Sequence, residues 1–253
     1  MPGFKGLKFM GNLPNKKLSL NEVYHLLNCC RISKGGEAVV CEGRSDYSVY
    51  KLFTKDFQFS PMSENKEKKI TLLHQLDLDY SNKILSSLSC NGQIIGYEAT
   101  TDPFFDTYKL HDLIIDDEEL LHYLKRTREI LDYFRSKGVI YVDFDPRNTL
   151  INRSNGEIMF CDMDNIEVGG YPVDALPWDA YEYKQSRGID YGIHPYMHNV
   201  VLLRALSEDI YTISNSSMRR HFKLGAYRTL KSMQQPEYFN DGYLIDYIKK
   251  LNR

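Results

Sequence analysis

The stretch "GVIYVDFDPRNTLI", residues 138 to 151, decides how this chain is interpreted. It places Asp143, Asp145 and Asn148 close together in a run of Val, Ile, Tyr and Phe. A carboxylate in apolar surroundings costs free energy unless a cation or a hydrogen-bond donor pairs with it. These three residues are therefore candidate site residues, and other parts of the chain must supply their partners.

Composition excludes several classes of partner. The chain has 253 residues and a formal net charge of −2, so neither a nucleic acid nor an anionic membrane surface is indicated. No apolar run is long enough to span a membrane, and the first residues lack the apolar core of a secretory signal. The five cysteines show no zinc-like spacing, which favours free thiols in a reducing compartment. We expect a cytoplasmic location, with an exported effector as the alternative.

Periodicity and turn signals predict an α+β chain. Helical spacing is found at residues 18–32 and again at 63–79, and a longer helix with an acidic start and a glycine end is expected at 116–138. Short β-rich segments fill most of the sequence between residues 32 and 100, with a strong hairpin signal at Asn91-Gly92. From about residue 194 onward the pattern is mostly helical.

A second hairpin brings a further carboxylate to the opening stretch. The segments "TLIN" and "IMFC" read as strands joined at Asn155-Gly156, and the second strand delivers Asp162 beside Asn148. A carboxylate and a carboxamide oxygen suit Mg²⁺, which keeps few protein ligands and binds phosphate oxygens as well. We therefore expect Asn148 and Asp162 to be metal ligands, which leaves Asp143 to accept a proton.

This arrangement resembles the protein-kinase superfamily. In that family the catalytic loop reads H-R-D-L-x-x-x-N and the metal-binding D-F-G follows on the next hairpin. Here "YVDFDPRN" (141–148) matches at Asp143 and Asn148, and "CDMD" (161–164) matches at Asp162.

The N-terminal part resembles the same family independently. "YSVYKLF" (47–53) is similar to the V-A-I-K strand, which makes Lys51 the residue that reaches the α- and β-phosphates. "SKGGEAVV" (33–40) resembles the glycine-rich loop, with Gly35 and Gly36 beside the phosphates. The strand that contains Tyr97 looks like the one leading to the adenine-binding hinge.

The resemblance implies a bilobal protein-kinase-like fold. A β-rich N-lobe would occupy residues 1–100 and a mainly helical C-lobe residues 101–253. The implied function is that of a divergent protein kinase, which transfers the γ-phosphoryl group of Mg-ATP to the hydroxyl of an acceptor, a protein or a small molecule. Asp143, Lys51, Asn148 and Asp162 would be catalytic, Gly35, Gly36, Lys51 and Tyr97 would bind nucleotide, and Mg²⁺ (or Mn²⁺) would be the metal. A pseudokinase that binds nucleotide or a partner is the main alternative, and a small-molecule kinase is the second.

Several positions depart from the family pattern. Tyr141 replaces the catalytic-loop histidine, and Asp145 stands where many protein kinases carry lysine. Glu64 and Glu67 are candidates for the helix glutamate that pairs with Lys51, but the hydrophobic register places a lysine, Lys69, at the expected position. The pair His194 and His198 has helical spacing without a third ligand, which favours a structural role over zinc binding.

Overall fold

The computed structural model divides the chain into two compact units. The first comprises Met1–Phe105 together with Phe160–Asp174, and the second comprises Asp106–Met159 together with Ala175–Arg253. Segment 160–174 thus belongs to the first unit, whereas the sequence predicted a single boundary near residue 100. The residues that the structure describes are 11–34, 37–55, 58–102, 105–107, 117–143, 148–152, 154–176, 180–181, 184–185 and 188–194.

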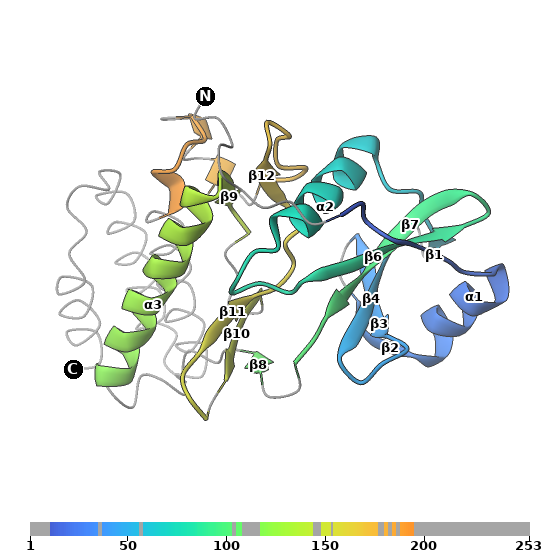
Figure 1. Ribbon diagram of the computed structural model, residues 1–253, viewed down its shortest axis with the longest axis horizontal. Coiled ribbons are helices and arrows are strands. Elements are labelled where there is room, and N and C mark those ends of the chain that lie inside the picture. The colour runs from blue at the N-terminus through green and yellow to red at the C-terminus, as the bar shows by residue number, and fades with distance from the viewer. Residues whose placement is uncertain are drawn as a thin grey trace, which may run out of the picture. The chain divides into compact units, whose positions relative to one another are not determined.

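The first unit contains a seven-stranded sheet (Figure 1). Its strands follow the order β1-β6-β7-β4-β3-β2, and β5 pairs with β4. β1 is parallel to β6, whereas the pairs among the other strands are antiparallel. The bounds are β1 Asn15–Lys17, β2 Arg31–Lys34, β3 Ala38–Glu42, β4 Ser48–Lys55, β5 Gln58–Phe59, β6 Ile84–Cys90 and β7 Gln93–Thr100.

The two helices of the first unit begin at serine caps. α1 (Leu20–Cys29) starts with a capping box, in which Ser19 and Glu22 each accept a hydrogen bond from the other's backbone N–H. α2 (Glu64–Leu76) starts after Ser63, whose side chain accepts from the backbone N–H of Lys66. Both helices confirm the predictions from hydrophobic spacing, with shorter bounds.

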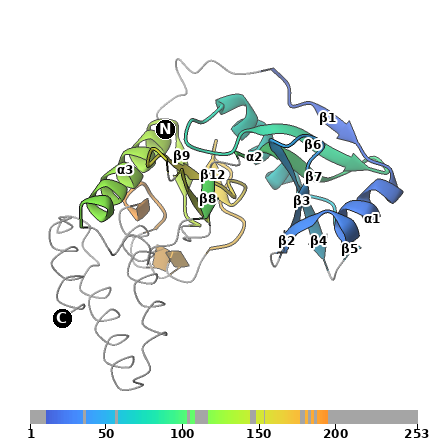
Figure 2. The same cartoon turned by 90° about the horizontal axis from the view of Figure 1, so that it is seen from below.

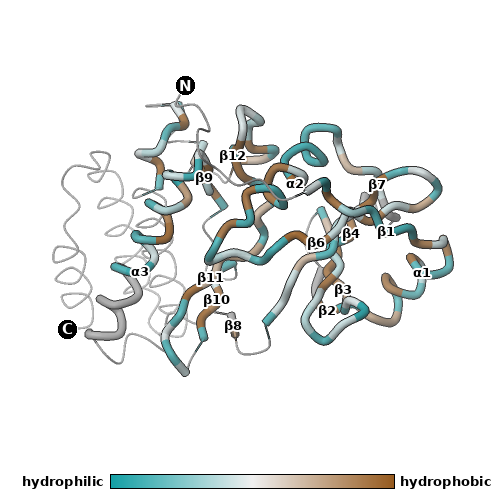
Figure 3. The backbone as a smooth tube through the Cα atoms, in the orientation of Figure 1, coloured by the Kyte–Doolittle hydropathy of each residue, from teal (hydrophilic) through white to brown (hydrophobic). Residues whose placement is uncertain are grey.

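The sheet of the first unit separates two environments, because successive side chains of a strand point to opposite faces. Tyr50 of β4 is buried with Val23 of α1 in one hydrophobic cluster. Its neighbour Lys51 therefore points to the other face, together with Phe53. On that face the Lys66 ammonium of α2 lies 4.4 Å from the centre of the Phe53 ring. Figure 2 shows α1 beside β2, β3 and β4, and Figure 3 shows that strongly hydrophobic stretches alternate with hydrophilic ones along these elements.

One tight turn and one glycine fix how β6, β7 and β4 align. Asn91 and Gly92 have φ of 51° and 78°, as the predicted tight hairpin requires. Gly96 of β7 lies directly against β4, where a Cβ atom would stand only 2.2 Å from the carbonyl oxygen of Lys51. This close approach helps to fix the backbone position of Lys51.

The second unit combines one long helix with short strands. Its described elements are α3 (Asp117–Ser136), β8 (Phe105–Thr107), β9 (Val139–Tyr141), β10 (Thr149–Asn152) and β11 (Ile158–Phe160), of which β8 and β11 reach one residue into the first unit. α3 ends before Gly138, which has a φ of 73° and confirms the predicted glycine stop. The rings of Phe134 and Tyr141 meet edge to face at 6.4 Å, which packs α3 against β9.

The α+β class is confirmed, with a multi-stranded sheet and three helices among the described residues. The bilobal kinase-like arrangement stays a prediction. The mainly helical C-lobe is not evident in the described part of the second unit, because the segment expected to be most helical, 195–253, lies outside it. In the part of the chain that the structure describes, no helix has both the length and the apolar character needed to cross a bilayer.

Candidate active site

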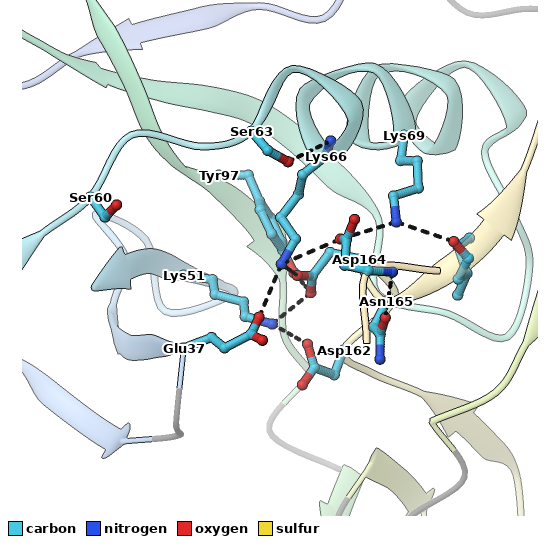
Figure 4. A network of polar contacts seen from close by, with 12 residues as sticks. Glu37, Lys51, Ser60, Ser63, Lys66, Lys69, Tyr97, Asp162, Asp164 and Asn165 are labelled. Carbon is cyan, nitrogen blue, oxygen red and sulfur yellow. Dashed lines mark hydrogen bonds and ion pairs between the residues drawn. The ribbon is translucent and has the colours of Figure 1, made fainter. Parts of the chain in front are cut away.

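Lys51 and Asp162, two of the predicted catalytic residues, contact each other in the first unit. The Lys51 ammonium forms an ion pair with the Asp162 carboxylate, although 111 positions separate them in the chain (Figure 4). Lys51 lies on β4, and Asp162 follows the end of β11. The structure thus brings together two side chains that the sequence assigned to one site.

Asp164 is the carboxylate at the centre of this site, with an ion-pair or hydrogen-bond partner at each of its two oxygens. Its Oδ1 lies 2.5 Å from the Lys51 ammonium and accepts a hydrogen bond of 2.9 Å from the Tyr97 hydroxyl. Its Oδ2 lies 3.2 Å from the Lys66 ammonium. The Asp164 side chain is only 2% exposed, so these partners replace the water that a carboxylate otherwise needs.

α2 contributes two inward-facing lysines. Lys66 and Lys69 are three positions apart, which places them on one face of the helix. Lys69 is fully buried, and its ammonium lies 3.0 Å from Asp174 while donating to the backbone carbonyls of Ile166 and Pro172. Lys51, Lys66, Lys69, Tyr97, Asp162, Asp164 and Asp174 are called the Lys51 cluster below.

The helix glutamate expected to pair with Lys51 is not found among the described contacts. Glu64 is 80% exposed and pairs with Lys68 on the outer face of α2. Lys51 pairs with Asp162 and Asp164 instead. The predicted register of α2, which placed Lys69 on the inner face, agrees with this arrangement. α2 supplies the cluster with lysines, and the loop after β11 supplies the acids.

Lys51, Lys66 and Asp164 keep one another ionised. Burial by itself would lower the pKa of Lys51, but the carboxylates of Asp164 and Asp162 outweigh it and raise that pKa. Burial by itself would raise the pKa of Asp164, yet the Lys51 and Lys66 ammonium groups hold it well below its usual range. Lys66 also has a raised pKa: the carboxylates led by Asp164 outweigh its burial.

Asp162 differs from Asp164 in exposure, protonation and backbone. Its side chain is 36% exposed, so one side of the carboxylate is open to a ligand. Burial raises the pKa of Asp162 to about 6, with repulsion from Asp164 adding to the effect and Lys51 opposing it. Its φ is 60°, a left-handed conformation that Asp tolerates better than most residues and that often occurs at functional sites.

Tyr97 lies on β7 directly opposite Lys51 of β4. It is buried, and its hydroxyl is engaged by Asp164. Burial, with the nearby acids adding to it, raises the pKa of Tyr97 well above its usual value, so the hydroxyl remains a donor. The predicted role of Tyr97 in nucleotide binding is thus accompanied by a contact that holds Asp164 in place.

The predicted glycine-rich segment lies at the β2–β3 hairpin. Gly35 and Gly36 themselves lie outside the described residues. The flanking residues Lys34 and Val39 are paired across the hairpin, which confirms that the two strands meet around this turn. Glu37, which follows the glycines, places its carboxylate 3.3 Å from the Lys66 ammonium.

In the second unit, Asn148 donates a side-chain hydrogen bond of 3.2 Å to the backbone carbonyl of Asp143. This contact joins the two ends of the predicted catalytic loop. Asp143 is half-buried, whereas Asp145 lies outside the described residues. The carboxamide oxygen of Asn148 does not take part in the contact with Asp143, so it is the atom that could bind a metal.

Tyr141 is anchored through its backbone by a buried histidine. The N–H of Tyr141 donates to Nε2 of His194 at 2.9 Å, and both side chains are buried. Burial lowers the pKa of His194 to about 4, although a hydrogen bond with the Leu131 backbone opposes the shift. His194 is therefore a neutral structural residue, as predicted, while His198 lies outside the described residues.

We expect His194 to make stability depend on pH. Its pKa of about 4 lies below the ordinary value, so the unfolded chain takes up a proton on acidification that the folded chain excludes. Stability should therefore fall with pH below about 6.5, by about 2 kcal/mol between pH 7.5 and 5. Urea unfolding of the native chain and of His194→Gln at both pH values measures this. An equal loss in both proteins would contradict the assignment.

Sequence reasoning missed Lys66 and Asp174 and gave Asp164 no role. The repeated acid in "CDMDN" was the available signal for Asp164, since Asp162 and Asp164 lie on one short turn. Nothing in the local pattern distinguishes Lys66 from its exposed neighbour Lys68. Its burial depends on the packing of α2, which only the folded chain reveals.

Two side chains, one in each unit, carry oxygen atoms of the kind that bind a hard divalent cation. Asp162 offers a partly exposed carboxylate and Asn148 a carboxamide oxygen, which are ligand types that Mg²⁺ accepts. Within the described residues, no cluster of three or more His, Cys, Asp or Glu side chains forms a complete metal site.

Comparison with known proteins assigns this chain to no family. No protein-family model matches the sequence, and no curated protein matches it significantly.

Proposed function

We propose that the chain is an ATP-dependent phosphotransferase of the protein-kinase-like superfamily. The order of its elements supports this proposal. A strand hairpin around two glycines is followed by a third strand with Lys51, a helix, a D-x-x-x-x-N loop and a hairpin that ends at Asp162. The same order of parts is characteristic of protein kinases.

One observation carries the proposal above the rest: the ion pair between Lys51 and Asp162. Phosphoryl transfer needs a cation that reaches the α- and β-phosphates close to a carboxylate that holds the metal. These two residues were selected from separate motifs of the sequence, and they contact each other although they lie 111 positions apart in the chain.

In the proposed reaction each residue has a separate role. Lys51 orients the α- and β-phosphates, and the backbone at Gly35 and Gly36 contacts the phosphates. Asp143 aligns the acceptor hydroxyl and takes its proton as the γ-phosphoryl group is transferred. Asn148 and Asp162 would hold Mg²⁺, which neutralises charge shared by the β- and γ-phosphates. Positioning and charge neutralisation account for most of the catalysis in this reaction class.

Asp164 and Lys66 take the place of the usual helix glutamate in this proposal. In protein kinases a glutamate on the helix holds the strand lysine. Here Asp164 contacts Lys51 with one oxygen and Lys66 of α2 with the other. The acid is thus supplied by the loop after β11, and α2 is attached to it through a lysine.

A catalytically inactive nucleotide- or partner-binding module is the second candidate. It is favoured by the departures from the family pattern, with Tyr141 in the place of the catalytic-loop histidine and Asp164 in the place of the D-F-G glycine. For an active enzyme, the acceptor hydroxyl could belong to a protein or to a small molecule.

Binding of nucleotide is the first test. Mg·ATP at a hundredfold excess over its Kd should stabilise the chain by about 2.7 kcal/mol, which corresponds to a rise in Tm of roughly 5–10 °C. Lys51→Met should lose most of that rise, because the phosphates lose their cation. Lys83→Met, a control at a partly exposed lysine that pairs with Asp77, should keep it.

Turnover separates the candidates. Transfer of ³²P from labelled ATP to lysate proteins indicates a protein kinase, and transfer to members of a metabolite panel indicates a small-molecule kinase. A Tm rise without transfer to either supports the inactive module. Absence of both the Tm rise and transfer would contradict the proposed function.

A further inference from the structure

Segment 160–174, which carries Asp162, is attached to the rest of the first unit on both sides of that residue. On the N-terminal side, the N–H of Phe160 donates to the carbonyl of Tyr80 at 2.7 Å. The carbonyl of Phe160 accepts from the N–H of Asn82 at 3.2 Å. The start of the segment is therefore fixed two positions before Asp162.

On the C-terminal side, a single buried lysine of α2 contacts the segment at three places. The Lys69 ammonium donates to the carbonyl of Ile166 at 3.3 Å and to that of Pro172 at 3.0 Å, and it lies 3.0 Å from the Asp174 carboxylate. The same carboxylate lies 3.5 Å from the Lys66 ammonium. Figure 4 shows Lys69 pointing from α2 toward this segment. Lys69 thus joins the middle and the end of the segment to the helix.

The segment is also closed on itself. Val168, the last residue of β12 (Ile166–Val168), exchanges two backbone hydrogen bonds with Tyr171. The N–H of Asp174 donates to the side-chain oxygen of Asn165 at 3.1 Å. These bonds form a compact loop whose two ends meet near the residues that follow Asp162.

The burial of Lys69 makes this attachment strong. Its side chain is 0% exposed, and a buried ammonium is stable only when charged or polar partners replace its water. All of the partners of Lys69 among the described residues belong to segment 160–174. If the segment moved away from α2, Lys69 would lose these partners, so the closed position is favoured.

Phosphorylation orders the corresponding loop in many protein kinases, because the added phosphate pairs with cations of the protein. In this chain Asp174 is a permanent anion, and it already pairs with Lys69 and Lys66. We propose that Lys69 and Asp174 are positioning residues of the phosphotransferase, which hold Asp162 ready to bind metal without any phosphorylation of the chain. The inference rests on the proposed function, whereas the attachment of the segment exists without nucleotide.

Activity of the unphosphorylated chain is the first test. Protein treated with a phosphatase, and shown by mass spectrometry to carry no phosphate, should transfer ³²P from ATP at once and without a lag. Prior incubation with unlabelled Mg·ATP should leave the initial rate unchanged. A lag, or a rate that rises after this incubation, would overturn the inference and leave the proposed function in place.

Hydrogen exchange of the full chain without nucleotide measures the attachment itself. In Asp174→Asn, at a side chain that is 26% exposed, the amides of residues 165–174 should exchange at least about tenfold faster than in the native chain. Lys69→Met, which removes the buried cation, should give the same result. Lys83→Met and Asp77→Asn should not, although Lys83 likewise pairs with an aspartate and donates to a backbone carbonyl.

The Mg²⁺ dependence of transfer tests the positioning of Asp162. Lys69→Met and Asp174→Asn should each raise the Mg²⁺ concentration that gives half the maximal rate by about tenfold, as is typical when a residue that orients a metal ligand is replaced. A smaller amount of folded protein would lower the maximal rate but would not change that concentration. Asp174→Glu keeps the anion and should keep the native Mg²⁺ dependence.

The measurements separate this inference from the proposed function. Faster exchange at residues 165–174 with unchanged exchange in α1, together with the shifted Mg²⁺ dependence, supports the inference. Unchanged exchange in both Asp174→Asn and Lys69→Met would overturn it at any level of activity, and a native Mg²⁺ dependence in both would overturn the positioning role. Absence of transfer by every form of the chain would overturn the proposed function and the positioning role with it.

Discussion

Replacing Asp164 by alanine should lower the free energy of unfolding by about 3–5 kcal/mol, the largest stability effect expected in the first unit. Asp164 is 2% exposed, and it is the carboxylate that Lys51 and Lys66 share. Alanine would leave both ammonium groups short of a buried partner and would also leave the Tyr97 hydroxyl without its acceptor. The loss should appear as a lower urea midpoint at an unchanged m-value.

Three variants make this result specific. Asp164→Asn keeps an acceptor for Tyr97 and should be less destabilising than alanine. Asp164→Gly introduces the glycine that the D-F-G motif carries at this position. It should still be strongly destabilising, because the loss of stability comes from the missing negative charge. Glu64→Ala, which removes an exposed ion pair on α2, should change stability by no more than about 0.5 kcal/mol. Similar losses for Asp164→Ala and Glu64→Ala would contradict the role of Asp164.

Replacing Asp162 or Asp143 by alanine should reduce phosphoryl transfer by about 10³-fold or more, which is the largest effect expected on activity. The Asp162 variant would lack the carboxylate proposed to bind the metal. The Asp143 variant would lack the group that aligns and deprotonates the acceptor. The fold should persist in both variants, since both carboxyl groups lie at partly exposed positions. Initial rates of ³²P transfer and circular dichroism measure the two properties.

Asp162→Asn is a stricter version of the same test. It preserves the size of the side chain and tolerates the left-handed backbone, so a loss of activity would report the lost charge. Asp77→Asn is the matched control, because Asp77 also has a positive φ, of 43°, and lies at the exposed end of α2. Full activity in Asp162→Asn or Asp143→Ala would contradict the assigned roles, and equal loss in Asp77→Asn would indicate a backbone effect.

The sequence by itself located several of the elements in their order, although it did not predict β1, β8 or β9. Hydrophobic spacing located α1 and α2, turn residues located the hairpins at Asn91-Gly92 and Asn155-Gly156, and Gly138 marked the end of α3. These are local features, because capping, periodicity and turn chemistry depend on residues only a few positions apart. The motifs also selected Lys51 and Asp162 as members of one site.

Only the tertiary structure decided what those residues contact. The sequence suggested a helix glutamate for Lys51, yet the folded chain pairs Lys51 with Asp162 and Asp164 and turns Lys66 and Lys69 toward the same acids. Tyr50 likewise reads as an ordinary strand residue until its hydroxyl is found buried without a described partner. Such contacts join residues up to 113 positions apart, and the free energy of a buried charge depends on whichever partners the packing of the whole unit places beside it.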